Sequence, residues 1–408
     1  MDRIPVIIAL TKRPVRSGGG PAGIAYKLLK GLVNDHRFTF YLMSASEAKI
    51  WRIDSISDLE SISLEFYPSP ALGRLRKRLK SILLVRTSYH LYRYALPLLH
   101  PRNLKIGKII SEILSNQRGV LNLQGVPFPT DVPDTALIQD NLFVIWSEHS
   151  KGGLTRQWEQ LDGERVRNWL SYKFLKRRYA FLLAHSAHIV FPSWGAVHLF
   201  ESYNGLEIPR QKLSVIYNGV GDLLHQVGDL ETAEEPGLFV TVAEHVPEKG
   251  LDIALEGLAR LKRHWQWCVI GRRTEWSAVL LEKARDLEVL DHINFIEQLT
   301  NKEVLKLMAR AEAIIMTQRA AVFDLVIIEA MMLGKAVLAT PVGGNVEALG
   351  EDYPLYIHSA EDLAKALTNI GDKDLRRQGL ANRDRYRAMF TEEAMLNAYA
   401  SLYSEIGQ

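Results

Sequence analysis

The sequence predicts an α/β protein of two domains, each built on a parallel sheet covered by helices. Short apolar runs alternate with amphipathic stretches nearly from end to end, which is typical of parallel strands joined by helices. At 408 residues the chain is too long for one ordinary core and suits two domains of about 200 residues each. A hydrophobic fraction of 47% and a charged fraction of 24% are those of a soluble globular protein.

The first half of the chain opens with an apolar run at 5–10 that predicts a strand. A Gly-rich loop and a helix from about residue 21 to 33 follow it. After these, a long basic helix begins near Arg165, and further strands are predicted at 38–43, 119–123, 142–146 and 188–192. The second half repeats this scheme, with a helix from Leu251 and strands at 238–243, 267–271, 293–296, 313–317 and 336–340.

The seam between the domains is predicted at 217–221, where Asn-Gly forms a turn, with the stretch to Pro236 as a linker. The predicted domains are therefore residues 1–215 and 216–385. A final helix over 386–408 follows them, and Thr391 is a candidate N-cap for it.

Cysteine content and hydropathy restrict the cellular compartment. The single cysteine, Cys268, rules out an internal disulfide and is expected to pack inside a strand. The apolar run at 4–10 is too short for a signal peptide or a membrane span, and no later stretch reaches about 18 uninterrupted apolar residues. We therefore expect a cytoplasmic protein.

The most informative motif runs from Phe323 to Glu347. An apolar helix carrying Glu329 is followed by a Gly stop, a short strand and a Gly-Gly turn at 343–344. This order of helix, strand and turn suits phosphate binding by backbone N–H groups, with a carboxylate placed to hold a ribose.

Three further segments accompany this motif: Ser193 after a predicted strand, the junction at 215–220, and the loop Pro-Glu-Lys-Gly-Leu at 247–251. Together they resemble the retaining family-four glycosyltransferases, which have the GT-B fold. The resemblance covers residues 188–403 well and residues 1–45 loosely. It implies two Rossmann-like domains facing each other across a cleft, with a nucleotide-diphosphate sugar in the second domain and the final helix packed back on the first.

The resemblance also implies roles for individual residues. Lys249 would stabilise the departing diphosphate, and Glu329 would hold the ribose. His149, at a predicted strand end, would touch the hydroxyls of the donor sugar, or else is a structural histidine. The residues expected at the donor are Gly19, Gly20, Ser193, Asn218, Glu244, Gly271, Arg272, Arg273, Phe323, Leu325, Val326 and Glu329. Those expected at the acceptor are Asn122, Gln124, Glu148 and Lys151.

The helix motif departs from the family pattern at three positions, because Val322 and Asp324 replace its two glycines and Ala321 replaces its first Glu. Ala321 stands eight residues before Glu329, where the family carries another Glu that faces the transferred sugar. Two uses of the nearby Asp324 stay open. It presents its carboxylate to the sugar as a catalytic group, or it caps the helix that follows.

The lysine loop departs in the same way. Glu244 stands five residues before Lys249, where the family carries an Arg. A carboxylate at this position repels a diphosphate. Arg272 and Arg273, just after the next predicted strand, are the candidates for the missing cation.

A basic stretch between residues 72 and 105 contains no acidic residue. Its leucines recur at helical spacing, so it suits an anionic membrane surface, together with a second basic cluster at 173–179. The alternative is an ordinary solvated helix face. Nucleic acid is not expected, because no recognition module accompanies the charge.

The sequence therefore predicts a retaining glycosyltransferase that moves a sugar from a nucleotide-diphosphate sugar to a glycan or lipid-linked acceptor. The expected pathway is synthesis of a surface polysaccharide such as lipopolysaccharide, at the inner face of the membrane. No cofactor and no metal are expected, since the twelve His residues are scattered without zinc spacing. The departures at positions 244 and 321 leave an alternative, a catalytically silent GT-B subunit that binds glycan and supports a partner glycosyltransferase.

Overall fold

The chain forms two compact units. The computed structural model describes residues 3–10, 20–44, 49–64, 101–125, 132, 134–150, 152, 169–227 and 234–407. The first unit consists of Met1–Pro192, Ala196–Ile216 and Leu396–Gln408, and the second of Ser193–Gly195 and Tyr217–Met395.

Within the described residues, the first unit has a seven-stranded sheet in the order β3-β2-β1-β4-β5-β6-β7. Of these strands, β2 and β3 run antiparallel and the other neighbours run parallel. The strands are β1 (Ile4–Leu10), β2 (Phe38–Ser44), β3 (Lys49–Ile53), β4 (Gly119–Gln124), β5 (Leu142–Ser147), β6 (His188–Phe191) and β7 (Leu213–Val215). The central strands are buried along almost their whole length, which is why they appear in the sequence as continuous apolar runs.

The helices of the first unit follow the predicted alternation with strands. They are α1 (Gly20–Leu32), α2 (Ile56–Leu64), α5 (Pro101–Leu114), α6 (Asp134–Leu137), α8 (Trp169–His185), α9 (Trp194–Asn204) and α18 (Glu392–Gly407). The first residues of α9 and α18 belong to the second unit.

Helix α18 completes the core of the first unit. Tyr399 and Tyr403 are 1% and 0% exposed, and the Tyr403 ring meets Phe38 of β2 edge-on at 6.0 Å. Near the end of the helix, Gly407 packs so closely on Ile4 of β1 that a Cβ would lie 2.6 Å from the Ile4 side chain. The last segment of the chain therefore packs on the strands that begin it.

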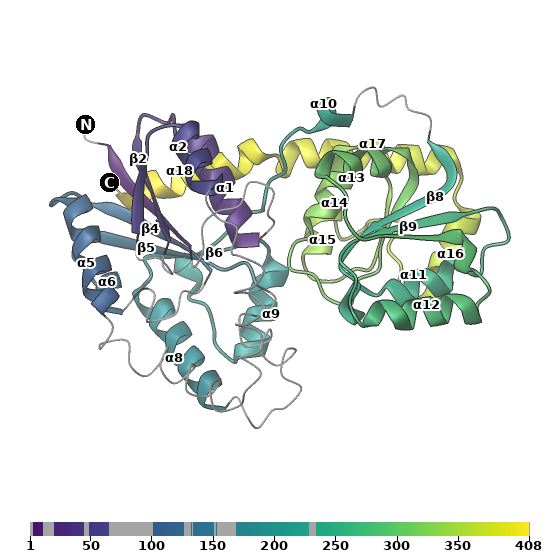
Figure 1. Ribbon diagram of the computed structural model, residues 1–408, viewed down its shortest axis with the longest axis horizontal. Helices are drawn as coiled ribbons and strands as arrows, with labels where there is room; N and C mark the ends of the chain where they lie inside the picture. Colours follow the sequence, from purple (N-terminus) through teal and green to yellow (C-terminus); the bar gives the residue numbers. More distant parts are fainter. Residues whose placement is uncertain are drawn as a thin grey trace. The chain divides into compact units, whose positions relative to one another are not determined.

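The second unit has a parallel sheet in the order β10-β9-β8-β11-β12. Its strands are β8 (Glu235–Val242), β9 (Gln266–Ile270), β10 (Ile293–Ile296), β11 (Ala311–Met316) and β12 (Val337–Ala339). Its helices are α10 (Leu224–Val227), α11 (Leu251–Leu258), α12 (Trp276–Asp286), α13 (Asn301–Arg310), α14 (Leu325–Met332), α15 (Gly344–Leu349), α16 (Ala360–Asn369) and α17 (Asp372–Met389). Figure 1 shows α11, α12 and α16 on one face of this sheet and α13, α14 and α17 on the other.

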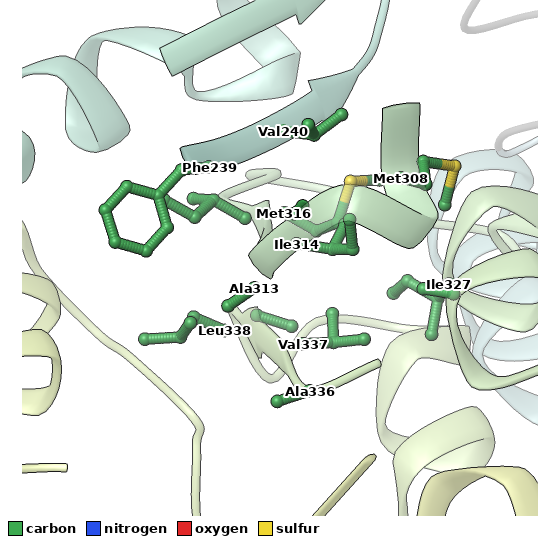
Figure 2. Close-up of a cluster of buried hydrophobic side chains, with 14 of the residues drawn as sticks. Phe239, Val240, Met308, Ala313, Ile314, Met316, Ile327, Ala336, Val337 and Leu338 are labelled. Atoms are coloured by element: carbon green, nitrogen blue, oxygen red, sulfur yellow. The ribbon is translucent and has the colours of Figure 1, made fainter. Parts of the chain in front are cut away.

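The core of the second unit lies between β8, β11, β12 and the helices that cover them. Phe239, Ile314 and Leu338, one from each strand, are all 0% exposed, and Met308 of α13 and Ile327 of α14 lie over the same sheet (Figure 2). The α/β class predicted from the alternating pattern is thus confirmed. Cys268 lies buried in β9, as expected.

The predicted strands are found, and two short ones escaped prediction. Strand β3 reads Lys-Ile-Trp-Arg-Ile and lies partly exposed at the edge of its sheet, where its exposed Lys49 and Arg52 discourage further pairing. Strand β7 has only three residues. In the part of the chain that the structure describes, no helix combines the length and apolar character needed to cross a bilayer.

Candidate functional site

The order of strands in the second unit reverses beside β8. This strand pairs with β9 on one side and with β11 on the other. After β8 the chain adds β9 and β10 on the first side and then crosses to add β11 and β12 on the second. Ligands of doubly wound sheets bind outside the carboxyl ends of the strands at such a point. The loops that follow the two strands, 243–250 and 317–324, therefore frame the candidate site.

Hydrogen bonds join these two loops directly. The Thr317 hydroxyl donates to the Gly250 carbonyl at 2.8 Å, and the Arg319 backbone N–H donates to the Glu248 carbonyl at 2.8 Å. The Arg319 guanidinium also donates to both carboxylate oxygens of Asp252, at 2.7 and 2.9 Å. Burial raises the pKa of Asp252, but the hydrogen bonds and charge of Arg319 outweigh it, so the pKa is lowered overall. The pair therefore stays charged and holds the loops together.

Glycine is required where the loops meet. Gly250 has φ 61°, in the left-handed region, and a Cβ there would lie 1.9 Å from the carbonyl oxygen of Thr317. A Cβ on Gly271, just after β9, would likewise lie 2.0 Å from the carbonyl oxygen of Ala243. The loop after β8 is thus in backbone contact with the loops on both sides of it.

Lys249 ends the 3-10 turn η3 (Pro247–Lys249) in the loop after β8. Its Nζ is 3.0 Å from Oδ2 of Asp324, and only 18% and 13% of the two side chains are exposed. Gln318 Nε2 donates to the same oxygen, and the Val326 N–H donates to Oδ1 of Asp324 at 3.1 Å. Asp324 is therefore the N-cap of α14 and the ion-pair partner of Lys249.

A second cation near the site is also paired with a carboxylate. Arg272, directly after Gly271, forms an ion pair with Glu244, and 71% and 39% of these side chains are exposed. Arg273 donates from Nη2 to the Phe295 carbonyl at 3.0 Å. The carboxylate at position 244 thus contacts the very cation that the sequence offers in place of the missing Arg, and the two charges offset each other locally.

The expected ribose ligand lies on α14, the helix that Asp324 caps. Leu325 and Val326 form the first turn of this helix and Glu329 lies one turn further on; all three are partly buried. Phe323 precedes the helix and is 7% exposed. These residues follow the loop that faces Lys249, as the order of the motif predicts.

Three donor candidates belong to other segments of the chain. Asn218 is buried, and its Oδ1 has no hydrogen-bond partner among the described residues. The neighbouring Tyr217 stacks on Phe323 with ring centroids 5.2 Å apart. Gly20 opens α1 in the first unit, and Gly19 lies outside the described residues.

The Gly-Gly turn at 343–344 serves close backbone packing. A Cβ on Gly343 would lie 2.0 Å from the carbonyl oxygen of Ala321, and one on Gly344 would lie 2.1 Å from that of Val322. The Val322 carbonyl also accepts a hydrogen bond from Ser193 Oγ. Ala321 itself is buried, so the position that carries Glu in the resembling family is filled here by a small core residue.

The sequence did not indicate the contact made by Glu347 of α15. Its carboxylate accepts hydrogen bonds from the Trp194 N–H at 2.8 Å and from the Gly195 N–H at 2.7 Å. These are among the N–H groups that a helix leaves unpaired at its beginning, here α9. No sequence signal reveals such a partner, because more than 150 residues separate the two segments.

In the first unit, polar side chains meet at the carboxyl ends of β4 and β5. Gln124 Oε1 lies 2.7 Å from His149 Nε2. Asn122 Oδ1 accepts hydrogen bonds from Gln124 Nε2 at 3.1 Å and from Ser147 Oγ at 2.9 Å. Asn122 and Gln124 are 0% and 4% exposed, so both amides expected at the acceptor are engaged inside this network.

Two neighbouring titratable groups at the end of β5 are perturbed in opposite directions. Burial lowers the pKa of His149 to about 4, and its Nδ1 is buried with no partner among the described residues. Burial raises the pKa of Glu148, although its Oε1 accepts a hydrogen bond from the Ser150 N–H at 2.9 Å. Perturbed groups at strand ends are typical of functional sites. Lys151 lies outside the described residues.

The expectation of a basic surface at 173–179 is partly wrong. Arg178 of α8 is 2% exposed and forms an ion pair with Asp134, so it supports the fold instead of facing a membrane. Its neighbour Arg177 is exposed. Residues 72–100 lie outside the described residues, and only the helical backbone is described for 101–105.

The lowered pKa of His149 predicts a pH-dependent contribution to stability. The folded pKa of about 4 lies below the ordinary value of 6.5, so protonation favours the unfolded chain. The stabilising contribution is complete above the ordinary value and is lost as the pH falls toward 4, by about 2 kcal/mol at about pH 5. Urea unfolding at about pH 7.5 and about pH 5 should show this loss in the wild type and not in His149→Gln. The control His36→Gln removes an exposed histidine and should behave as the wild type; equal losses in all three proteins would contradict the prediction.

Comparison with known proteins relates part of the chain to a glycosyltransferase family. The family model for Glycosyl transferases group 1 matches residues 226–387. MJ1178, an uncharacterized glycosyltransferase of Methanocaldococcus jannaschii, is 27% identical over 205 residues, which are 48% of this chain and 55% of that protein. A glycogen synthase of Mycobacterium tuberculosis is 26% identical over 202 residues, 47% of this chain and 48% of that protein. The chain thus spans about half the length of these two relatives.

Among solved structures, HepE of Anabaena in complex with UDP-glucose superposes with a TM-score of 0.66. The alignment covers 99% of this chain and 100% of that one at 15% identity, which shows likeness of fold. The family match covers most of the second unit, and the fold likeness covers nearly the whole chain. Residues 226–387 match the glycosyl transferases group 1 family model, and the fold of the chain is that of the GT-B glycosyltransferases.

Proposed function

We propose that this chain transfers a sugar from a nucleotide-diphosphate sugar to a glycan or lipid-linked acceptor, with retention of configuration at the anomeric carbon. The observation that carries the proposal is the position of Lys249 at the strand-order reversal, inside the residues that match the family. The similarly folded HepE was solved with UDP-glucose, which supports a nucleotide sugar as the donor.

In this proposal the donor diphosphate takes the place of Asp324 at the Lys249 ammonium. The bond between the anomeric carbon and the phosphate oxygen breaks, and the lysine stabilises the negative charge that develops on the diphosphate. The acceptor oxygen bonds to the anomeric carbon, and its proton passes to the departing phosphate oxygen. Asp324 remains the cap of α14, and Glu329 holds the ribose. The scheme requires no metal and no cofactor.

The first unit would contribute side chains that bind sugar hydroxyls. His149 and Glu148 stand at the carboxyl end of β5, where ligands of parallel sheets bind; Glu148 is buried and His149 is partly buried. Hydrogen bonds from such side chains to hydroxyl groups would select and orient a sugar.

A second function is favoured by the charge balance of the site. Lys249 is paired with Asp324 and Arg272 with Glu244, and position 321 lacks a carboxylate. A chain whose cations are offset in this way suits a catalytically silent subunit that binds glycan and supports a partner glycosyltransferase. A measurement of nucleotide binding distinguishes the two functions, because only the active transferase is expected to bind a nucleotide sugar.

The proposed setting is the synthesis of a surface polysaccharide, lipopolysaccharide included, by a cytoplasmic protein at the inner membrane face. Support comes from the basic composition of residues 72–105. Vesicles of anionic lipid should retain the wild type and release a variant with Arg74, Arg76, Lys77 and Arg78 changed to Glu. As a control, Lys302 and Lys306 of α13 changed to Glu should leave retention unchanged; equal retention of all three proteins would remove the membrane from the proposal.

An active transferase should be stabilised by its donor. Thermal unfolding is measured with UDP, GDP, ADP, CMP and dTDP and with sugars attached to each. A ligand at about 100 times its dissociation constant adds about 2.7 kcal/mol to the free energy of unfolding. One clear response identifies the donor class, whereas no response to the whole panel makes the silent subunit the better function.

Lys249→Ala should lower the turnover rate, because the developing diphosphate charge loses its cation. The expected loss of transition-state stabilisation is about 2–4 kcal/mol. Steady-state rates measure this, and the control Lys302→Ala, at an exposed residue of α13, should be unaffected. The variant Asp324→Asn keeps a helix cap but removes the charged partner of Lys249. The affinity of this variant for the nucleotide should therefore not fall. Unchanged turnover in folded Lys249→Ala would remove this lysine from the mechanism.

A further inference from the structure

A chain of side-chain hydrogen bonds runs through the first unit from α18 to His149. Asn122 Nδ2 donates to the Tyr403 hydroxyl at 2.7 Å, and Gln124 Nε2 donates to Asn122 Oδ1 at 3.1 Å. Gln124 Oε1 lies 2.7 Å from His149 Nε2. The chain therefore links a helix near the end of the sequence to a candidate ligand-binding side chain.

The donor-to-acceptor direction of these hydrogen bonds determines which ring nitrogen of His149 carries a proton. Ser147 Oγ and Gln124 Nε2 both point their hydrogens at Asn122 Oδ1. With its amide nitrogen used there, Gln124 presents its oxygen to the imidazole, and an amide oxygen only accepts. The proton of the neutral ring is then on Nε2, and Nδ1 is left with a free lone pair.

Burial favours this direction over its reverse. If both amides were turned over, Gln124 would donate to Nε2 and the ring proton would lie on Nδ1. His149 Nδ1 is buried without a partner among the described residues, so that proton would be an unsatisfied buried donor. Buried N–H groups without a partner are rarer and more costly than acceptors with an unused lone pair. The lowered pKa of His149 agrees with a ring that is neutral near pH 7.

The network is supported along its whole length by buried groups. Asn122, Ser147 and Tyr403 are all 0% exposed. The Tyr399 hydroxyl forms hydrogen bonds with Ser147 and Gln124, and burial raises its pKa to about 12, so it remains protonated. Water cannot easily compete with these bonds, so the amides are held in one orientation.

We propose that Gln124, oriented by Asn122 and Tyr403, is a positioning residue that keeps the proton of His149 on Nε2 and presents Nδ1 as an acceptor to a sugar hydroxyl. The identity of the ligand as a sugar rests on the proposed function, whereas the state of the ring does not. Donor and acceptor sugars both carry such hydroxyls, and separate probes distinguish them.

The first experiment measures the tautomer in the full chain without ligand. Nitrogen-15 histidine labelling and two-bond nitrogen–proton spectra near pH 7 report which ring nitrogen is protonated, and the signals lost in His149→Gln identify this residue. We expect a protonated Nε2 and an unprotonated Nδ1. A proton on Nδ1, or a charged ring, would overturn the proposal without reference to activity.

Variants test which residues set the tautomer. In Asn122→Leu the Gln124 amide is free to turn, so we expect a mixture of the two tautomers. Gln124→Glu retains an acceptor and should keep the proton on Nε2. Tyr386→Phe is the matched control, because Tyr386 is a buried tyrosine whose hydroxyl donates to the Val220 carbonyl at 3.0 Å in the second unit. A wild-type pattern in folded Asn122→Leu would exclude positioning by this network.

Ligand probes test the free lone pair. UDP-glucose and UDP are compared for the donor sugar, and a maltooligosaccharide for the acceptor. A shift of the His149 Nδ1 signal with UDP-glucose and not with UDP would assign the contact to the donor sugar, and a shift with the oligosaccharide would assign it to the acceptor. Probes that bind without moving this signal would overturn the contact. If the whole nucleotide panel fails to bind, the proposed transferase function fails, while the tautomer result still decides the positioning role.

Discussion

The hydrogen bond from the Thr317 hydroxyl to the Gly250 carbonyl joins the loops after β8 and β11, and the candidate donor site depends on this contact. Because Gly250 has no Cβ and a left-handed backbone, the two loops approach closely enough for Arg319 to donate hydrogen bonds to the Pro247 and Glu248 carbonyls of the opposite loop. The same approach brings Lys249 within 3.0 Å of Asp324. One small residue at the strand-order reversal therefore determines where the key cation of the site stands.

Because the cations of this site are paired with carboxylates, an anion binds here by replacing a carboxylate and not by entering an open cationic pocket. The Lys249–Asp324 pair is largely buried, and a buried ion pair that loses one partner without replacement is strongly destabilised. An incoming anion must therefore exchange with the carboxylate, and its affinity reflects the difference between the two interactions. A group carrying more than one negative charge competes better than a single carboxylate does, which favours a diphosphate over weaker anions.

Sequence reasoning succeeded where the signal is local and failed where partners are distant. The buried strands and the Lys249 and Glu329 segments stand out because each is a continuous pattern of a few residues. Strand β3 was missed because its exposed edge position removes the apolar run. The pairing of Lys249 with Asp324 and the hydrogen bond between Asn122 and Tyr403 join residues 75 and 281 positions apart, so only the folded chain reveals them.

Helix α18 has a consequence for how the protein is made. The strands of the first unit precede the second unit in the sequence, but the tyrosines that fill their core and contact their polar network follow it. During translation the first unit therefore stays incomplete while the second unit is synthesised. Phe38 and Asn122 lack their contacts with Tyr403 during this time. Until the final turns emerge, the nascent chain exposes a partly apolar sheet surface, which is the kind of surface that chaperones recognise.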